Sequence, residues 1–403
     1  MAMTDSGPDD HRVHEAVGPA FEPLEAGGAI GVGVISLLSL GVLPVLLGSL
    51  VDEHRISAPD IGLAAMLELL TMGVVTGLAG MVLKPHRLRL IATLASLALV
   101  LADLAILRAS GPSILALRAA AGAAEGLLLW ITVGMIARTV TPERWAGVFF
   151  TSQVLAQLAL AVVLAAWVMP RFGANGGFAA LAAASLVGIA PALVCPRRFA
   201  PLPTAPGEGG APPLRGWIAL GAILIYMAAN GAVSVYLQPL AHQAGLGADV
   251  ARTALWTSLV AQVAGAAAAT ALAGRVRYFT VFMITTVAFL IVWYVFGRRS
   301  PAWLFIAANA LAGLVFLFLA PFIVPLIIDA DPSRRAAMQS GAAQLLGGAL
   351  GPLLASQVVG ERDVRGVLWL AVGLMLAGVA VVTWLRLTST GAQARLASAM
   401  REA

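Results

Sequence analysis

Long apolar stretches recur along the whole chain and predict its architecture. Twelve stretches of about 20 residues or more carry little or no charge, and as helices they could each cross a hydrocarbon core of about 30 Å. They show no alternation of period two, and lipid offers no partners to open backbone groups, so we expect helices and not strands. The predicted spans are residues 28–51, 61–83, 90–108, 112–137, 146–170, 174–195, 216–240, 253–273, 278–297, 301–328, 336–359 and 366–386.

The composition agrees with a chain that is surrounded mostly by lipid. Of its 403 residues, 60% are hydrophobic and 11% charged, and the mean hydropathy is +0.91, whereas soluble domains carry about 25% charged residues. The net charge of +5 is spread over short loops, which argues against a nucleic-acid partner. The lone Cys195 supplies neither a disulfide nor a metal cluster. We therefore predict an all-α polytopic membrane protein, monomeric, with the lipid bilayer as its partner and no cofactor or metal.

Segments unsuited to membrane spans divide the chain into two groups of six. The acidic N-terminal segment is expected to be a disordered cytosolic tail, and a Pro/Gly-rich middle segment cannot hold a helix. No segment remains for a soluble catalytic domain, which argues against an enzyme. The predicted domains are a tail (1–27), a six-helix bundle (28–198), a cytosolic linker (199–214), a second six-helix bundle (215–388) and a cytosolic tail (389–403).

The distribution of Lys and Arg predicts the orientation of the chain. With both termini inside, the cytosolic segments hold sixteen of these residues and the outer loops eight, the bias expected of cytosolic termini. One Lys stands against 24 Arg in an Ala/Gly-rich chain, a composition that points to a bacterium with a GC-rich genome. We therefore expect a multi-pass protein of the bacterial cytoplasmic (inner) membrane.

The two halves repeat each other at an offset of 190 residues. Thr141-Pro-Glu-Arg-Trp-Ala-Gly147, before span 5, matches Asp331-Pro-Ser-Arg-Arg-Ala-Ala337, before span 11, and Gly41 matches Gly231. Because each half has an even number of spans, the two repeats are parallel in topology. The sequence thus predicts two pseudo-symmetric six-helix bundles, an arrangement typical of carriers that work by alternating access.

With these features the chain resembles the major facilitator superfamily over roughly residues 28–388. The resemblance rests on the plan of six plus six spans, the basic 2–3 and 8–9 loops, Arg118 followed four residues later by Gly122 in span 4, and Gly351-Pro352 in span 11. It implies secondary transport of a small molecule between the two bundles, with span 4 lining the central cavity.

Two family patterns are incomplete in this chain. In the 2–3 loop, Met81 stands where the family usually has Asp, and Lys84-Pro85-His86-Arg87 follows. Span 5 has Ala161-Val162 where drug/proton antiporters usually have Gly-Pro. The second departure weakens an assignment to drug efflux without removing it.

Four ionisable groups lie within predicted spans and are the main candidates for function. Counted from the span ends, Glu68, Asp103 and Arg118 should lie at one level, and Glu125 should lie about 10 Å deeper, near the bilayer centre. Arg118, Gly122 and Glu125 share one helix face. With three acids for one cation, at least one carboxyl lacks a fixed counter-charge, so it should hold a proton near neutral pH.

Two interpretations of these charges remain open. In the functional one, Glu125 or Glu68 is the proton-coupling site, and Arg118 binds an anionic substrate or tunes the acid, since intramembrane charges mark functional sites by default. In the other, Arg118 and Glu68 form a bridge that only holds the bundle. Asp103 is a further proton-coupling candidate, although we expect it to reach water near the surface.

Polar side chains in otherwise apolar spans are candidates for substrate binding. Convergent amides and phenols in an apolar pocket commonly orient a small ligand, but hydrogen bonds between helices are an equal alternative. The candidates are Tyr226, Asn230 and Ser234 in span 7, Gln153 and Gln157 in span 5, and Gln344 in span 11.

These features together predict a secondary active transporter whose partners are protons and a small-molecule substrate. The cation in the cavity favours an organic or aromatic carboxylate that enters by proton symport. The alternative is proton-driven efflux of lipophilic drugs or metabolites, in which Arg118 would stay paired with acid throughout. No phosphate-binding loop is visible for direct use of ATP.

Overall fold

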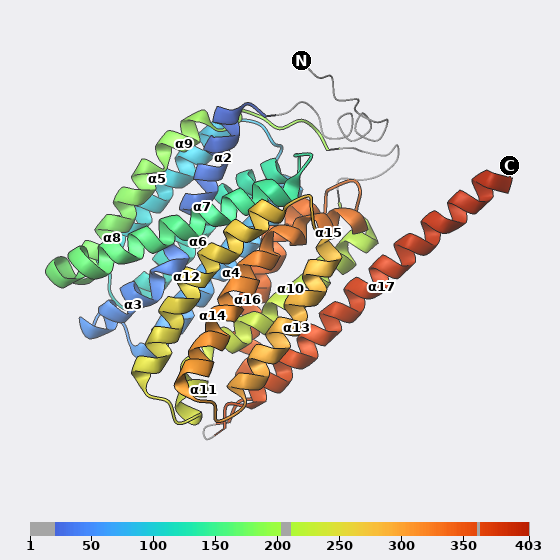
Figure 1. Ribbon diagram of the computed structural model, residues 1–403. Coiled ribbons are helices and arrows are strands. Elements are labelled where there is room, and N and C mark those ends of the chain that lie inside the picture. The colour runs from blue at the N-terminus through green and yellow to red at the C-terminus, as the bar shows by residue number, and fades with distance from the viewer. Residues whose placement is uncertain (1–20, 203–210, 361–362, 403) are drawn as a thin grey trace, which may run out of the picture. The chain divides into compact units, whose positions relative to one another are not determined.

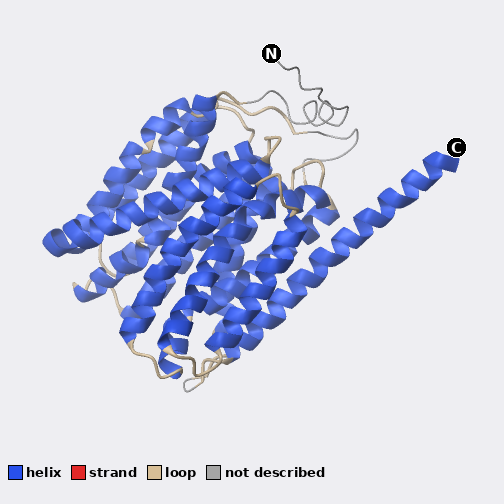
Figure 2. Cartoon of the chain, in the orientation of Figure 1, coloured by secondary structure: helices blue, strands red, loops and turns tan. Residues whose placement is uncertain are grey.

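The computed structural model describes residues 21–202, 211–360 and 363–402. These residues form helices joined by short turns and contain no strand (Figure 2). Contacts divide the chain into two compact units, Met1–Gly210 with Ala269–Gly274, and Ala211–Ala268 with Arg275–Ala403. The all-helical prediction is thereby confirmed.

In the N-terminal unit, α6 lies at the centre. It packs against α2, α4 and α5, while α5 also contacts α8 and α9 (Figure 1). The helices of this unit are α2 Pro23–Ser36, η1 Ser39–Gly41, α3 Leu43–Asp52, α4 Ala58–Val82, α5 Leu88–Ile106, α6 Pro112–Ile136, α7 Pro142–Val163, η2 Leu164–Val168, α8 Met169–Val187 and α9 Ile189–Val194.

In the C-terminal unit, α10 is the helix with the most extensive packing. It packs against α15, α16 and α17, and α13 packs against α14. The helices are α10 Leu214–Val235, α11 Leu237–Gln243, α12 Ala248–Leu272, α13 Tyr278–Phe296, α14 Ala302–Leu319, η3 Ala320–Phe322, α15 Ile323–Ala330, η4 Ala337–Gln339, α16 Ser340–Ala355 and α17 Gly366–Glu402.

Ten segments of the described residues are long and apolar enough to cross a membrane. Two places explain the difference from the twelve predicted spans. One 53-residue segment, Pro142–Val194, covers predicted spans 5 and 6, and Gly173, with φ 58° and ψ −152°, interrupts the helical conformation inside it. Predicted span 11 corresponds to α16, whose 16 residues are too few for it to be counted among these ten segments.

The predicted domain boundaries shift at both ends of the chain. Helix α2 begins at Pro23, inside the segment expected to be a tail (1–27), because Pro is well tolerated in the first helical turn. Residues 1–20 lie outside the described part, as do residues 203–210 of the linker. Helix α17 runs on to Glu402, so most of the segment predicted as a tail from residue 389 is helical.

Several spans are interrupted where a proline removes a backbone donor. A proline cannot bond the carbonyl four residues earlier. Span 1 is accordingly broken between α2 and α3, with Pro44 in the first turn of α3, and span 7 is broken at Tyr236, three residues before Pro239. The helix α16, in contrast, continues through Pro352.

The structure reproduces the internal repeat in its helix boundaries. The first residues of α4 and α12, α5 and α13, and α6 and α14 are each 190 positions apart. A hydrogen bond repeats at the same offset. Glu53 Oε1 accepts from Ala174 N at 2.8 Å, and Gln243 Oε1 accepts from Val364 N at 3.2 Å. Because these side chains join the end of the first span to the start of the sixth in both halves, the pseudo-symmetry extends to individual contacts.

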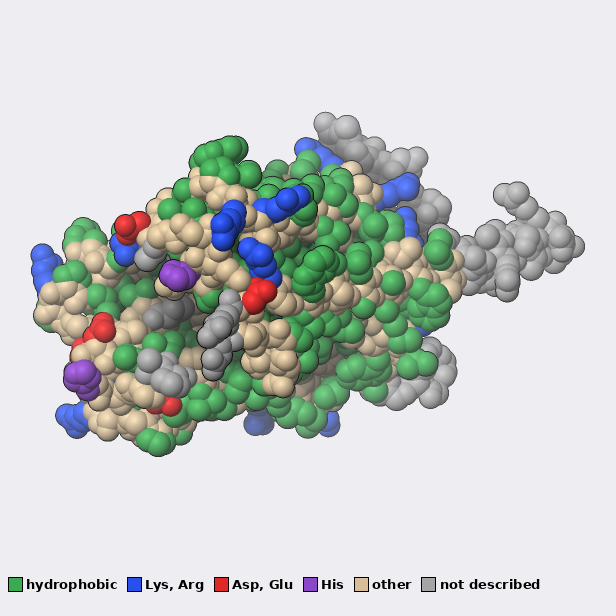
Figure 3. All heavy atoms as spheres, turned by 90° about the horizontal axis from the view of Figure 1, so that it is seen from below, with side chains coloured by type: hydrophobic (Ala, Val, Ile, Leu, Met, Phe, Trp, Pro, Cys, Tyr) green, Lys and Arg blue, Asp and Glu red, His purple; other side chains and the backbone are tan. Residues whose placement is uncertain are grey.

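Hydrophobic side chains cover much of the outer surface. Figure 3 shows them spread over one face, and among the exposed ones are Trp303 at 68% and Trp369 at 79%. Large exposed apolar surfaces generally mark contact with an apolar partner. Lipid contact explains this surface, in agreement with the predicted membrane protein.

Glycines let the central helices of each unit approach closely. A Cβ on Gly122 would lie 2.2 Å from the carbonyl oxygen of Glu68 in α4, and one on Gly351 would lie 2.2 Å from that of Ala228 in α10. Gly126 and Gly347 make similar contacts one turn away. Each pair is a small-xxx-small motif that brings two backbones together.

We expect Gly122→Ala and Gly351→Ala each to lower stability by about 1–3 kcal/mol, because the added methyl group overpacks a backbone contact. Thermal unfolding of the purified protein in detergent measures the effect. The matched controls are Gly62→Ala in α4 and Gly221→Ala in α10, since a Cβ at either position meets nothing within 4 Å. Equal melting temperatures for test and control variants would contradict the packing argument.

Candidate functional site

The four intramembrane charges form one buried cluster in the N-terminal unit. Arg118 of α6 binds Glu68 of α4 with two donors, Nε to Oε2 at 2.8 Å and Nη2 to Oε1. Arg118 Nη1 also donates to Asp103 Oδ1 of α5 at 2.8 Å. All three side chains are completely buried. Residue counting predicted one common depth in the membrane for Glu68, Asp103 and Arg118. Their direct contact confirms this prediction.

Glu125 lies at the edge of this cluster. Its Oε1 atom is 4.0 Å from Arg118 Nη2 and accepts a hydrogen bond of 2.7 Å from Ser39 Oγ in η1. Although Glu125 follows Arg118 by two helical turns, the two long side chains extend toward each other along one face. Among the described residues, Asp103 Oδ2 and Glu125 Oε2 are buried atoms without a hydrogen-bond partner.

The packing of α6 on α4 explains why the cluster forms. Gly122 lies between Arg118 and Glu125 on the same face and sits against the backbone of Glu68. Because Gly122 has no side chain, α4 comes near enough for Glu68 to reach both donors of the Arg118 fork. Phe178 of α8 covers the guanidinium, whose Cζ lies 6.0 Å from the ring centroid.

Charge counting shows that the cluster cannot hold all its acids ionised at low cost. One guanidinium faces three carboxyls, which would give a net charge of −2 with every group ionised. Burial and mutual repulsion both oppose that state. The positive charge of Arg118 balances the carboxylate of Glu68 through the two-donor contact. Asp103 and Glu125, in contrast, each keep one oxygen without a hydrogen-bond partner. The arrangement therefore favours a bound proton on one of the last two.

Two expectations about this region were wrong. The face of Arg118, Gly122 and Glu125 was expected to line a central cavity, but it packs against α4 and the charged side chains are sealed inside one unit. Asp103 was expected to reach water, yet it is completely buried, because Arg118 draws its carboxyl into the interface between α5 and α6.

The polar residues of span 7 do not converge. Tyr226 is fully buried, with its hydroxyl 3.2 Å from Thr286 Oγ1 and its ring 4.7 Å from that of Phe282, both in α13. Asn230 donates to the carbonyl of Tyr226 in its own helix, and Ser234 is exposed. Tyr226 thus joins two helices, whereas Asn230 is partly buried and Ser234 is exposed.

The glutamines of spans 5 and 11 also have structural contacts. Gln157 Nε2 donates to the carbonyl oxygen of Leu37 at 2.6 Å, in the break of span 1. Gln153 is buried one turn earlier on α7. Gln344 Nε2 donates to Ser340 O of its own helix at 3.3 Å. A role of these residues in substrate binding remains a prediction.

Ser39, the neutral partner of Glu125, was not among the residues predicted from the sequence. A serine in an apolar span commonly bonds its own helix, so the residue type gives no signal. The available signal was Pro44, which predicts a break in span 1 and therefore an irregular backbone nearby.

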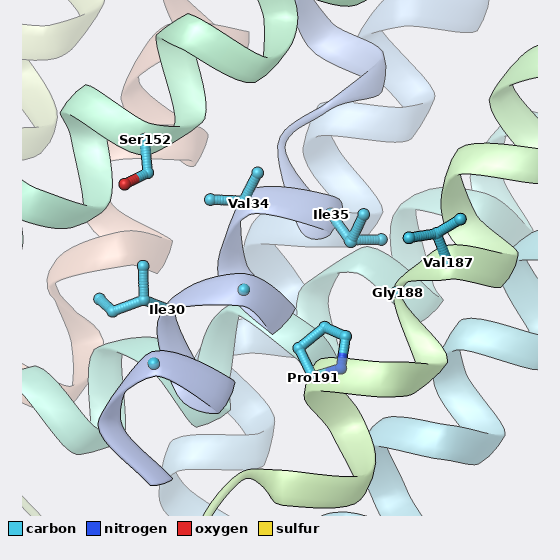
Figure 4. A pocket seen from close by; sticks show the side chains of 9 residues that line it. Ile30, Val34, Ile35, Ser152, Val187, Gly188 and Pro191 are labelled. Carbon is cyan, nitrogen blue, oxygen red and sulfur yellow. The ribbon is translucent and has the colours of Figure 1, made fainter. Parts of the chain in front are cut away.

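A pocket of about 340 Å³ lies in the same unit between α2, α7, α8 and α9. Figure 4 shows Ile30, Val34 and Val187 around it, with the hydroxyl of Ser152 as the one polar side-chain group. No member of the charged cluster lines this pocket. Within the described ranges, no group of three or more His, Cys, Asp or Glu side chains is arranged to hold a metal ion.

Comparison with known proteins identifies the fold. No family model and no curated protein matches the sequence. Among solved structures, the human organic anion transporter MFSD10 (TETRAN) matches with a TM-score of 0.69 and 14% identity, over 90% of this chain and 100% of that one. The chain has the major facilitator superfamily fold.

Two further structures of this fold show the same similarity. The transporter FucP, in the outward conformation, matches with a TM-score of 0.69 and 12% identity over 90% of this chain and 97% of that one. The proton:xylose symporter XylE, bound to 6-bromo-6-deoxy-D-glucose, matches at 0.65 and 12%, over 89% and 93%. The family resemblance seen in the sequence is thereby confirmed at the level of the fold.

Within the major facilitator fold of this chain, the two repeats differ in charge. The positions 190 residues after the charged cluster are all buried and uncharged. Arg118 therefore has no counterpart in the other repeat, and the acids have none either. The corresponding residues are Ser258, Trp293, Ala308 and Val315.

Proposed function

We propose that the protein is a proton-coupled secondary active transporter in which the cluster around Arg118 carries the proton. The observation that supports the proposal is the complete burial of three carboxyls around one guanidinium inside spans. Ionisable groups at such depth are costly and generally serve transport. The neutral equivalents in the second repeat support a function of this cluster beyond holding a bundle together.

The proton cycle follows from the charge count. Glu68 stays ionised on the Arg118 fork, and one proton binds to the pair Asp103 and Glu125. Release of that proton changes the net charge of the four groups from −1 to −2 in a sealed interior, so the deprotonated state favours an arrangement in which water or a donor reaches the carboxylates. Alternation between these two states would couple the proton gradient to the movement of the repeats.

For the substrate, we favour a lipophilic compound that is exported in exchange for protons. Arg118 already binds two carboxylates and lies near a third, so it has no free donor face for an organic anion. The pocket of the N-terminal unit is apolar as well, which suits a lipophilic group.

Proton symport of an organic carboxylate is the second candidate. It is favoured by the likeness to the human organic anion transporter MFSD10. In this case Arg118 would have to release Asp103 or Glu68 when the substrate binds. We also propose cytosolic termini, a monomer and the bacterial inner membrane as the setting of either function.

Transport in proteoliposomes separates the two candidates. An inside-acidic gradient should drive uptake of rhodamine 6G by exchange, and an inside-alkaline gradient should drive uptake of labelled 4-hydroxybenzoate by symport. Protein-free vesicles measure passive entry, and nigericin, which collapses the gradient, is the second control. We expect the dye to respond. Gradient-driven uptake of the carboxylate alone would establish symport. If the pH gradient drives uptake of neither compound, proton coupling is overturned for both candidate functions.

A further inference from the structure

The break in span 1 is held by side chains from two other helices. Helix α2 ends at Ser36 and α3 begins at Leu43, with η1 between them. From α6, Glu125 accepts the hydroxyl hydrogen of Ser39 at 2.7 Å. From α7, Gln157 donates to the carbonyl oxygen of Leu37 at 2.6 Å.

The hydroxyl of Ser39 differs from those of its neighbours in the same span. Ser36 Oγ donates to Gly33 O, and Ser49 Oγ donates to Leu46 O, both at 2.7 Å and both within their own helix. Ser39 is only 2% exposed, and its hydroxyl reaches a carboxyl on another helix. The broken backbone therefore contacts the charged cluster through this one hydroxyl.

Gln157 supplies a contact that does not depend on charge. A helix break in a membrane leaves carbonyl groups that need partners, and the amide of Gln157 satisfies that of Leu37. The same side chain packs against Gly41, where a Cβ would lie 2.8 Å from Gln157 Cδ. This neutral contact is the same at every pH, whereas the bond from Ser39 to Glu125 depends on whether the carboxyl is ionised.

We propose that Ser39 is the positioning residue through which the proton on Glu125 acts on the break of span 1, with Gln157 as its fixed support. The inference rests on the proposed proton-coupled function. Ionised Glu125 is a strong acceptor and holds Ser39. Protonation weakens that bond, so η1 is released from α6 on one side while Gln157 still holds it on the other.

The charged groups that face Glu125 are few and come from three helices. They are Arg118 on its own helix, Glu68 on α4 and, across the guanidinium, Asp103 on α5. The contact from span 1 is the neutral hydrogen bond that Ser39 donates. A change at Ser39 thus alters a donor to Glu125 without changing any charge around it.

Ser39→Ala tests the inference in transport. A hydrogen bond donated to a carboxylate favours its ionised form, so its loss lets the carboxyl keep its proton to higher pH. We expect the pH midpoint of gradient-driven dye transport to move upward by about one unit. Ser36→Ala is the matched control, because that buried hydroxyl bonds only its own helix, and its midpoint should equal that of the parent.

Glu125→Gln separates failure of this inference from failure of the proposed function. If Glu125→Gln abolishes coupling while Ser39→Ala keeps the parental midpoint, the role of Ser39 is wrong and the proton site stands. If Glu125→Gln still couples normally, Glu125 is not the acid that carries the proton, so the inference is wrong and Asp103 alone remains as the proton site of the proposed function.

A distance measurement provides a test that does not need transport. Spin labels at Leu24→Cys in α2 and Val45→Cys in α3, both exposed positions, would report the bend of span 1 in a Cys195→Ala background. We expect the distance distribution to change between acidic and alkaline pH, and to lose this change in Ser39→Ala. A distribution that is independent of pH in the otherwise unaltered chain would overturn the proposal.

Discussion

Arg118→Leu is expected to destabilise the protein by about 3–5 kcal/mol, because removal of one partner leaves buried charges without compensation. Glu68 would lose two hydrogen bonds and Asp103 one, in an interior where neither carboxyl reaches water. Thermal unfolding in detergent, followed by tryptophan fluorescence, measures the loss. We expect a lower melting temperature and a smaller yield of folded protein.

Two further variants identify the cause of that loss. Arg118→Lys keeps the charge but not the planar fork, so its stability should be intermediate. In the double variant Arg118→Leu/Glu68→Leu the cation and its main acid both disappear, and part of the stability should return. If the single leucine variant unfolds like the parent, the cluster holds no ionised acid and the charge argument is wrong.

The spans, the repeat and the level of the charges could be predicted from the sequence because each depends on a count along the chain. Span length follows from the thickness of the bilayer, and the offset of 190 residues recurs in the starts of three helix pairs. Counting from the span ends also brought Arg118 level with Glu68 and Asp103, which bind it in the structure.

The partners of a helix face could not be predicted in the same way. Periodicity groups Arg118, Gly122 and Glu125 on one side of α6, but it does not say whether that side meets a cavity or another helix. Gly122 could have been the clue, since a small residue on a polar face permits close helix packing. The structure places α4 against it, so the predicted cavity-lining face is a helix interface.

The polar residues outside the cluster show a second limit. Tyr226 and Gln157 were predicted to orient a ligand, and each makes a contact between helices of its own unit. In an apolar interior a buried donor must find an acceptor, and the nearest one is commonly a neighbouring helix. Residue type alone therefore cannot distinguish a binding group from a packing group.

The asymmetry between the repeats gives the cluster its significance. Both repeats keep the same helix register and the same contact between their first and sixth spans, so the fold does not require charges at these positions. Ser258, Trp293, Ala308 and Val315 fill them in the second repeat and are buried. Four ionisable groups in one repeat only are a cost that stability does not explain, and the proton binding that we propose accounts for it.

Glu125→Gln should abolish proton-driven accumulation of the dye against its concentration gradient. Exchange of dye for dye across the membrane, which needs no proton, should remain intact. For one coupled proton, a gradient of one pH unit can sustain at most about tenfold accumulation, and a carrier without the proton site can only equilibrate, which gives a ratio of about one. Gln keeps the size of Glu and an oxygen for the hydroxyl of Ser39, so the fold should survive. Dye accumulation and counterflow in proteoliposomes measure the two activities separately.

Glu68→Gln is the matched comparison and should give the opposite result. Glu68 is bound by two donors of Arg118 and stays ionised through the proposed cycle. Its replacement should therefore lower the stability of the protein. The molecules that still fold should couple transport to protons as the parent does. If Glu68→Gln loses coupling and Glu125→Gln keeps it, the proton resides on Glu68 and not on Glu125. Arg118 would then have to move away from Glu68 in every cycle.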